Sequence, residues 1–448
     1  MSFPAYPKYK DSGVEWLGQV PEHWGMVRLR YITECLDGKR IPLNSSERAD
    51  KQGAIPYWGA NCIVDYVDES LFDEELVLLG EDGAPFFDST KPVAFLSNGP
   101  IWPNNHVHVL RTKTTCFASF LVNVLNTTDY SQFIDGSTRD KLTQGQMGSI
   151  PLLLPPLAEQ RAIASFLDRE TSKIDALVAA QRKLIALLKE KRQAVISHAV
   201  TKGLNPDAPM KDSGIEWLGM VPEHWRVITV RRLISRIEQG RSPQCDAGPA
   251  GDNEWGVLKT GCVNRGKFNS SENKALPDQS EVHPEFEVKR GDVLMSRASG
   301  SLDLVGATAF VYETRSRLML SDKTFRILLV ENTDAEYFVA VFNSRPMRAQ
   351  IEQSISGAEG LANNLPQAKL RDFALCVPPV KEQRMIAADI MRRLLEIDAL
   401  TAEAGRAVDL LQERRTALIS AAVTGKIDVR CQGEPSPSNR MSYETQLS

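Results

Sequence analysis

KDSGVEWLG at residues 10–18 and KDSGIEWLG at residues 211–219 differ at one position, and each is followed by VPEHW, which ends at Trp24 and at Trp225. The two copies begin 201 residues apart (211 minus 10). Self-similarity at a fixed offset is the signature of a duplicated architecture. The repeat therefore predicts two related halves, each of which starts at one copy of this leading segment.

A second repeated motif marks the end of each half. PPLAEQR at residues 155–161 matches PPVKEQR at 378–384, 223 residues apart (378 minus 155). Paired prolines end the preceding element and stand directly before a periodic, proline-free segment. Each half therefore consists of a leading segment, a variable block and a closing segment, and the second variable block is about 22 residues longer (223 minus 201).

The closing segments are predicted to be long helices. From Glu159 to about residue 200 the sequence has no Pro or Gly, and apolar residues recur at heptad spacing in both copies. Each helix would be roughly 60 Å long at 1.5 Å per residue, which suits a spacer. The alternative is two unrelated amphipathic helices, each packed on its own domain. The predicted seam consists of Leu167, Ile174, Leu177, Leu184 and Leu188 in the first helix and Ile390, Ile397, Leu400, Leu411 and Leu418 in the second.

The variable blocks mix short β-like runs with one probable helix each, which predicts an α/β (α+β) fold class with a mostly β body. The expected organisation is two mixed α/β domains at 1–157 and 205–379, long helices at 158–204 and 380–427, and a polar, disordered tail at 428–448.

Composition narrows the class of protein further. The chain has 448 residues, 42% of them hydrophobic, and a formal net charge of -4. It has no apolar run of membrane-spanning length and no signal-peptide core at its start, so we expect a cytoplasmic protein with no membrane partner. The seven cysteines have neither CxxC pairs nor metal-ligand spacing. A net acidic chain is not a strongly basic nucleic-acid binder, and we expect tight DNA binding to require a partner.

The order of these motifs resembles the specificity subunits of Type I restriction-modification systems. The resemblance rests on SGVEWLG and VPEHW, a variable block, then PPLxEQR and a long helix, all repeated once over nearly the whole chain. It implies that each variable block reads one half of a bipartite, asymmetric target in double-stranded DNA. It also implies an antiparallel coiled coil with a pseudo-two-fold internal repeat. Aligning the midpoints of the two helices would place Glu170 near Arg414 and Lys191 near Arg393.

The resemblance also implies partners and cofactors. Two modification (methyltransferase) subunits are expected to dock on the helices, and restriction subunits, which act as translocase and endonuclease, complete the complex. S-adenosylmethionine, ATP and Mg²⁺ would be bound by those partners and none of them by this chain. The chain is then expected to be a non-catalytic subunit.

Polar and basic residues beside turns are the candidate DNA contacts, because these side chains bind phosphates and base edges. The first block offers Lys39, Arg40, Asn104, Asn105, Arg139 and Lys141, and the second offers Arg241, Ser242, Lys259, Asn264, Arg265, Lys267, Arg297, Ser299, Asn363 and Asn364.

Two other functions remain open at this stage. Pro277-Asp278 followed by Glu287-Val288-Lys289 spells a PD-(D/E)xK pattern, whose carboxylates could hold a metal ion for DNA cleavage. The other interpretation of this pattern is an ordinary strand with exposed charges.

The second alternative function is a protein scaffold that is built from repeats and does not bind nucleic acid. His23 and His224 sit beside the tryptophans of PEHW and are interpreted as structural anchors.

Overall fold

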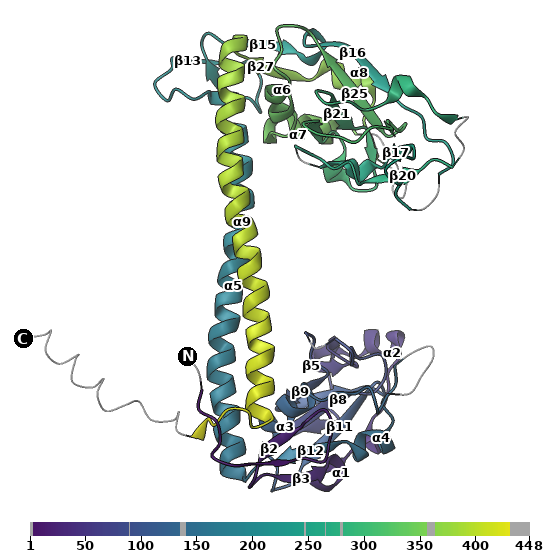
Figure 1. The fold of residues 1–448 in the computed structure, drawn as a ribbon, viewed down its shortest axis with the longest axis vertical. Helices are drawn as coiled ribbons and strands as arrows, with labels where there is room; N and C mark the ends of the chain where they lie inside the picture. The colour runs from purple at the N-terminus through teal and green to yellow at the C-terminus, as the bar shows by residue number, and fades with distance from the viewer. Residues whose placement is uncertain are drawn as a thin grey trace, which may run out of the picture. The chain divides into compact units, whose positions relative to one another are not determined.

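The structure is a computed structural model that describes residues 3–88, 90–134, 140–245, 248–264, 266–277, 281–355 and 363–430. The chain forms two compact units. Met1–Arg182 and Gly405–Ser448 make the first, and Lys183–Ala404 make the second. The division passes through both long helices, so each unit combines one variable block with parts of both helices (Figure 1).

The first unit has a β-rich body with short helices. Its elements are β1 (Tyr9–Asp11), β2 (Gln19–Pro21), β3 (Gly25–Arg28), α1 (Leu29–Ile32), β4 (Thr33–Cys35), η1 (Asp37–Lys39), α2 (Ser45–Asp50), β5 (Gln52–Trp58), β6 (Ile63–Val67), β7 (Phe72–Asp73), β8 (Leu76–Gly80), β9 (Ala94–Ser97), β10 (Pro100–Pro103), β11 (Val107–Thr112), α3 (Ala118–Leu125), α4 (Gln144–Ser149) and β12 (Pro151–Leu154). The helix α5 (Leu157–Lys202) follows directly.

The second unit repeats this order with additional short strands. Its elements are β13 (Met210–Asp212), β14 (Met220–Pro222), β15 (Arg226–Thr229), η2 (Val230–Arg232), β16 (Ile234–Gln239), β17 (Gly256–Leu258), η3 (Thr260–Cys262), β18 (Val263–Asn264), β19 (Lys267–Phe268), β20 (Asn273–Ala275), η5 (Pro284–Phe286), β21 (Val293–Ser296), β22 (Ala298–Ser299), η6 (Leu302–Leu304), β23 (Thr308–Phe310), β24 (Leu318–Met319), β25 (Thr324–Leu329), α6 (Ala335–Phe342), α7 (Arg345–Ser354), β26 (Asn363–Asn364), α8 (Gln367–Asp372) and β27 (Ala374–Val377), followed by α9 (Val380–Val423).

The two variable blocks share one sheet topology although their sequences diverge. The central sheet has the order β4-β11-β8-β9 in the first unit and β16-β25-β21-β23 in the second, and all its pairs are antiparallel. A second sheet contains one parallel pair in each unit, β5 with β10 and β17 with β24. The mixed α/β class is therefore confirmed, and the duplication extends into the variable blocks.

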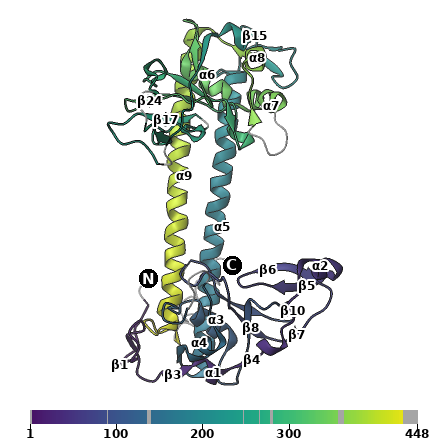
Figure 2. The same cartoon turned by 90° about the vertical axis from the view of Figure 1, so that its right-hand side faces the viewer.

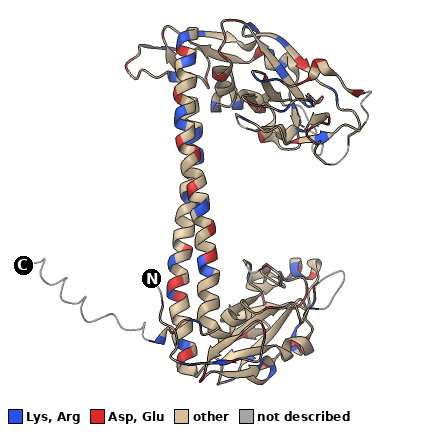
Figure 3. Cartoon of the chain, in the orientation of Figure 1, with Lys and Arg blue, Asp and Glu red and all other residues tan. Residues whose placement is uncertain are grey.

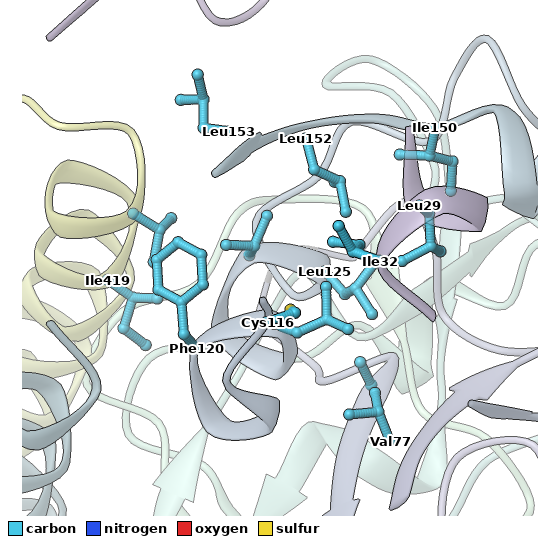
Figure 4. Close-up of a cluster of buried hydrophobic side chains, with 14 of the residues drawn as sticks. Leu29, Ile32, Val77, Cys116, Phe120, Leu125, Ile150, Leu152, Leu153 and Ile419 are labelled. Atoms are coloured by element: carbon cyan, nitrogen blue, oxygen red, sulfur yellow. The ribbon is translucent and has the colours of Figure 1, made fainter. Parts of the chain in front are cut away.

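Each unit buries its part of the helix pair in its own apolar core. In the first unit Ile163 and Leu167 of α5 share a core with Ile419 of α9 and Phe120 of α3 (Figure 4). In the second unit Ile196 of α5 lies in the core that contains the first turns of α9. Burial of these side chains, about 1.5–3 kcal/mol each, holds α5 and α9 together within each unit.

Seven of the ten predicted seam positions are correct, and the other three are displaced by one residue. Leu167, Ile174, Leu188, Ile390 and Ile397 are buried, and Leu411 and Leu418 are partly buried against the same clusters. In contrast, Leu177, Leu184 and Leu400 are exposed by 52%, 43% and 52%. The buried row runs through the next residue, as at Val178.

The reason for this error is visible in the sequence. At 177–178 and 184–185 two adjacent residues are apolar, so heptad spacing alone cannot choose between them. At 400–401 the less hydrophobic residue is the more buried one. Thr401 is half-buried, and its hydroxyl donates to the carbonyl of Ile397. Leu177, Leu184 and Leu400 therefore lie on the solvent-exposed surface of the helices.

The predicted midpoint register of the helices is also wrong. Glu170 pairs with Arg169 and Lys173 of its own helix, and Arg393 pairs with Asp389. The interhelical ion pairs are Asp175 with Arg415 (2.9 Å) in the first unit and Arg192 with Asp398 (2.7 Å) in the second. With the 223-residue offset of the closing segments these are the same pair twice, because 192 corresponds to 415 and 175 to 398. In each unit the two helices run antiparallel.

A buried glutamate at the start of each long helix accepts hydrogen bonds from the PEHW motif. Glu159 accepts from the Trp24 indole (3.1 Å), from His23 (2.9 Å) and from the Tyr6 hydroxyl (2.6 Å). Both tryptophans are fully buried, which confirms the histidines beside them as parts of a structural anchor. We call these three donors and Glu159 the first anchor.

The second unit contains the same anchor in a reduced form. Glu382 accepts from the Trp225 indole (3.0 Å) and from His224 (2.8 Å). The position that corresponds to Tyr6 is the exposed Asp207, so the second anchor has one donor fewer. Glu382 is accordingly 28% exposed, whereas Glu159 is 6% exposed.

The end of each long helix packs against the leading segment of a unit. Gly425 has a positive φ of 71°, and a Cβ there would lie 2.3 Å from Pro21. Its carbonyl accepts from the Tyr9 hydroxyl, so the end of α9 lies beside the N-terminal segment. Gly203, at the end of α5, takes the same conformation against Trp225.

The predicted tail begins slightly too early. The backbone amide of Asp428 donates to the carbonyl of Pro4, and Val429 is buried. Residues 428–430 thus belong to the first unit because they pack on its N-terminal segment. The remainder of the predicted tail, 431–448, lies outside the described residues.

We expect Glu159→Ala to lower the free energy of unfolding by about 3 kcal/mol, because it leaves the Tyr6 hydroxyl and the Trp24 indole buried without an acceptor. Glu382→Ala should cost about 1–2 kcal/mol, since its anchor is more exposed. Urea unfolding followed by tryptophan fluorescence measures both. Glu403→Ala, on the exposed face of α9, is the matched control. A Glu159→Ala variant as stable as this control would contradict the anchor.

The corrected seam makes a second prediction from two adjacent residues. Val178→Asp should lower the free energy of unfolding by at least about 2 kcal/mol, because it buries an unpaired carboxylate between α5 and α9. Leu177→Asp should change it by less than about 0.5 kcal/mol, as for an ordinary surface position. Thermal unfolding of the two variants decides the register. If Leu177→Asp lowered the free energy of unfolding more than Val178→Asp, the seam predicted from the sequence would be correct and the corrected seam wrong.

Candidate nucleic-acid interface

Four loops meet at one end of the central sheet in the first unit. β4 and β8 end where β11 begins, so the loops that follow Cys35 and Gly80 lie beside the loop that precedes Val107. The loop before α4 joins them through the hydrogen bond from the Leu142 amide to the Glu81 carbonyl. We call these loops, residues 36–40, 81–85, 104–106 and 140–143, the first reading end.

The second unit builds the equivalent site from the equivalent loops. Residues 240–245 follow β16, 297–301 follow β21, 320–323 precede β25, and 363–366 precede α8. The β22–β26 pairing joins Ser299 to Asn363 and Ala298 to Asn364. We call these loops the second reading end.

Close backbone packing shapes both reading ends. A Cβ at Gly240 would lie 1.9 Å from the carbonyl oxygen of Leu320, and a Cβ at Gly80 would lie 2.3 Å from the side chain of Ala84. Only glycine allows the chain to approach so closely at these two strand ends. The loops are therefore held against one another in both units.

A matched ion triad behind each reading end confirms that the two sheets correspond. Arg111 of β11 bonds Glu34 (2.8 Å) and Glu74 (2.7 Å). Arg326 of β25 bonds Glu238 (3.0 Å) and Asp292 (3.0 Å) at the same ladder positions. Aligning the two arginines places Lys323 of the second unit where His108 stands in the first.

The structure gathers most, but not all, of the candidate DNA contacts at the reading ends. Lys39, Arg40, Asn104, Asn105 and Lys141 lie at the first, and Arg241, Ser242, Arg297, Ser299, Asn363 and Asn364 lie at the second. Lys259, Asn264 and Lys267 lie elsewhere in the second unit, and Lys267 forms an ion pair with Asp398 of α9 (2.8 Å). Arg139 and Arg265 lie outside the described residues.

Several of these candidates point into the protein. Arg40 donates to Glu81 and to the carbonyl of Val107, both at 2.7 Å, and its side chain is 13% exposed. Asn104 is buried and accepts from the backbone amide of His106. Arg297 donates to the carbonyl of Asp322 and lies over the ring of Phe325. These side chains hold the loops together and leave Lys39, Asn105, Lys141 and Arg241 facing solvent.

The sequence interpretation missed three residues at the reading ends. Lys323 and Asp322 stand directly before β25, and His108 stands in β11, where it is 1% exposed. Lys323 could have been found from its place before a strand, by analogy with the residues before β11. His108 gave no such signal, because HVHVL reads as an alternating strand.

One cluster at the first reading end has donor types that suit a metal ion. The ligand atoms of Asp37, Glu81 and His108 all lie within 4.8 Å of one another. Both carboxylates already pair with Arg40, however, which lies 2.7 Å from Glu81 and 3.5 Å from Asp37. Burial alone would raise the pKa of Asp37, but the interactions with His108, the hydrogen bond from the Val109 amide and the charge of Arg40 together outweigh it, and the pKa is lowered. We assign no metal here.

The PD-(D/E)xK pattern does not assemble a visible metal site. Asp278 lies outside the described residues. Glu287 accepts from the backbone amide of Arg317, and the backbone amide of Lys289 donates to Asp292 in a turn. Their partners are those of an ordinary turn at a strand end.

Charges on the long helices are interleaved. Figure 3 shows Lys and Arg alternating with Asp and Glu along α5 and α9. The view in Figure 2 shows that the two helices lie side by side within each unit. No helix in the described part of the chain combines the length and apolar character needed to cross a bilayer.

Comparison with known proteins identifies the architecture. Residues 21–186 match the family model described as Type I restriction modification DNA specificity domain. The chain is 30% identical over 210 residues to the Type I restriction enzyme EcoEI specificity subunit of Escherichia coli, which covers 46% of this chain and 35% of that protein. It is 21% identical to the EcoKI specificity subunit of Escherichia coli strain K12 over 93% of this chain and 92% of that one.

A solved structure shares the fold over nearly the whole chain. A chain from a structural study of complex assembly and conformational transition of the type I R-M system superposes with a TM-score of 0.65 at 15% identity. The match covers 90% of this chain and 98% of that one. The duplicated motifs, the two equivalent reading ends and these similarities lead to one conclusion: the chain is similar in sequence to the specificity subunits of Type I restriction enzymes, and its residues 21–186 match their DNA specificity domain.

Proposed function

We propose that this chain is the DNA-reading subunit of a Type I restriction-modification complex, in which each unit reads one half of a bipartite, asymmetric target in double-stranded DNA. A specificity subunit recognises DNA and does not carry out the chemistry. The observation that carries the proposal is the pair of equivalent reading ends, which share one loop framework and differ in almost every exposed side chain.

The framework accounts for how two unlike half-sites are read. The ion triads of Arg111 and Arg326 fix the same strands in both units, so the loops project from the same positions. Exposed Lys39, Asn105 and Lys141 at the first reading end can reach phosphates and base edges. Arg241 and Lys323 do so at the second, where Arg241 can bind guanine in bidentate fashion. Different side chains on one framework give different half-sites.

The modification subunits dock, in this proposal, on the outer face of the long helices. Leu177 and Leu187 of α5 are exposed by 52% and 51%, and Leu395, Leu400 and Leu410 of α9 by 63%, 52% and 64%. An apolar stripe among interleaved charges is suited to a helical partner. Two modification subunits are inferred because the duplication supplies two equivalent surfaces.

We further propose that the chemistry and its cofactors belong to the partners. S-adenosylmethionine would be bound by the modification subunits, and ATP and Mg²⁺ by the restriction subunits of the full complex. This chain would bind none of them, and the complex would act in the cytoplasm.

Binding of cognate DNA by the complex with its modification subunits tests the reader role. Lys39→Ala should weaken discrimination at one half-site and Arg241→Ala at the other, each by about 1–3 kcal/mol where the side chain contacts a base. Gel shifts with duplexes that carry one scrambled half-site measure this. Lys8→Ala, whose side chain is 77% exposed and away from the reading ends, is the control. If the wild-type complex binds scrambled and cognate DNA equally, the chain is not a reader and the scaffold alternative stands.

A further inference from the structure

His108 is a buried residue of the first reading end whose ring contacts two of its loops. The side chain is 1% exposed and projects from β11. Its Nδ1 lies 2.6 Å from a carboxylate oxygen of Asp37, and its Nε2 lies 2.8 Å from the carbonyl oxygen of Leu142. The ring therefore joins the loop after β4 to the loop before α4, across the strand that carries it.

Both ring nitrogens of His108 have a hydrogen-bond partner. The carbonyl oxygen of Leu142 only accepts, so Nε2 donates to it. Nδ1 lies against the carboxylate of Asp37. Loss of either partner would leave a buried ring nitrogen unpaired, which is costly.

Charged groups surround the ring. The groups that face the ring are Asp37 of η1, Glu81 of the loop after β8 at 3.7 Å, and Arg40, which bonds Glu81. Lys141 reaches Glu81 from the rim at 3.5 Å. The two partly buried carboxylates are therefore paired by Arg40 and Lys141 as well as by the ring of His108, and such a charge is tolerated only when it is paired in this way.

The same network reaches all four loops of the first reading end. Asp37 also accepts from the backbone amide of Val109 (2.8 Å). The backbone amide of Glu81 donates to the carbonyl of His106 (2.9 Å). The backbones of Lys141 and Asp82 pair in an isolated antiparallel β-bridge. Lys39 and Lys141, which face solvent, stand directly beside residues that the network holds.

We propose that His108 is a positioning residue for DNA recognition by the first unit: its two hydrogen bonds lock the loops that carry the DNA-contacting side chains. The inference rests on the proposed function of the chain. The second unit uses another solution, because its corresponding residue is Lys323, whose side chain is 47% exposed and pairs with Asp322 (2.9 Å). The two units therefore differ in how rigidly their reading ends are held.

A half-site-resolved binding experiment tests the role in recognition. His108→Asn and His108→Gln each provide one donor group without a positive charge. In the complex with the modification subunits, selection from a duplex library randomised in both half-sites should show at least a tenfold loss of discrimination, about 1.4 kcal/mol, at the half-site that Lys39→Ala also affects. Discrimination at the other half-site is the internal control and should not change.

The outcomes separate this inference from the proposed function. If the wild-type complex fails to select any sequence, the reader role itself is wrong. If the wild type selects both half-sites and the His108 variants select them equally well, only the positioning role is overturned.

A spectroscopic measurement on the unaltered chain covers the case in which the variants do not fold. NMR of the full chain labelled with nitrogen-15 at its six histidines should show a His108 ring N–H that exchanges slowly with solvent, as expected for a buried and hydrogen-bonded ring. Rapid exchange of this N–H would overturn the proposal, and so would a shift of the His108 signals on addition of Zn²⁺, which would indicate a metal site.

Discussion

The hydrogen-bonded glutamate at the start of each long helix is the interaction on which the rest of the structure depends. Glu159 and Glu382 stand in the first turn of α5 and α9, where the helix dipole favours negative charge. Each binds the indole of a fully buried tryptophan from the leading segment of its unit. A buried carboxylate without donors would be costly, so the motifs PEHW and PPxxEQR are required together.

The glutamine that follows each of these glutamates adds further hydrogen bonds, and we call the Glu-Gln pair with its hydrogen-bond partners the joint. Gln160 accepts from the Phe117 amide and donates to the carbonyls of Thr115 and Pro155. Gln383 makes the same kind of contacts with Asp334, Asn332 and Pro378. In each unit, therefore, the glutamate at the helix start holds the leading segment. The glutamine beside it holds the start of the helix that follows the central sheet. The loops at the far end of the sheet are free to vary because no part of this joint depends on them.

Much of the fold could be predicted from the sequence because the residues that form the joint belong to motifs that occur twice in the chain. The duplication and the helix starts follow from PEHW and PPxxEQR with their offsets, and the mixed α/β class follows from the short β-like runs and the one probable helix of each variable block. The seam could be predicted only to within one residue, since pairs such as Leu177 and Val178 offer two apolar side chains at one heptad position. The partners of Arg40 and His108 could not be predicted, because Glu81 and Asp37 come from other loops and meet them only in the folded sheet.

The central claim is that one duplicated framework presents two different reading surfaces to DNA. Mapping methylated adenines across the genome of the host, with and without this gene, tests it most directly. The account predicts that the gene-dependent sites share two unlike half-sites separated by a spacer of fixed length whose bases vary freely. A single uninterrupted motif, two identical half-sites, or a methylation pattern that does not depend on the gene would contradict it.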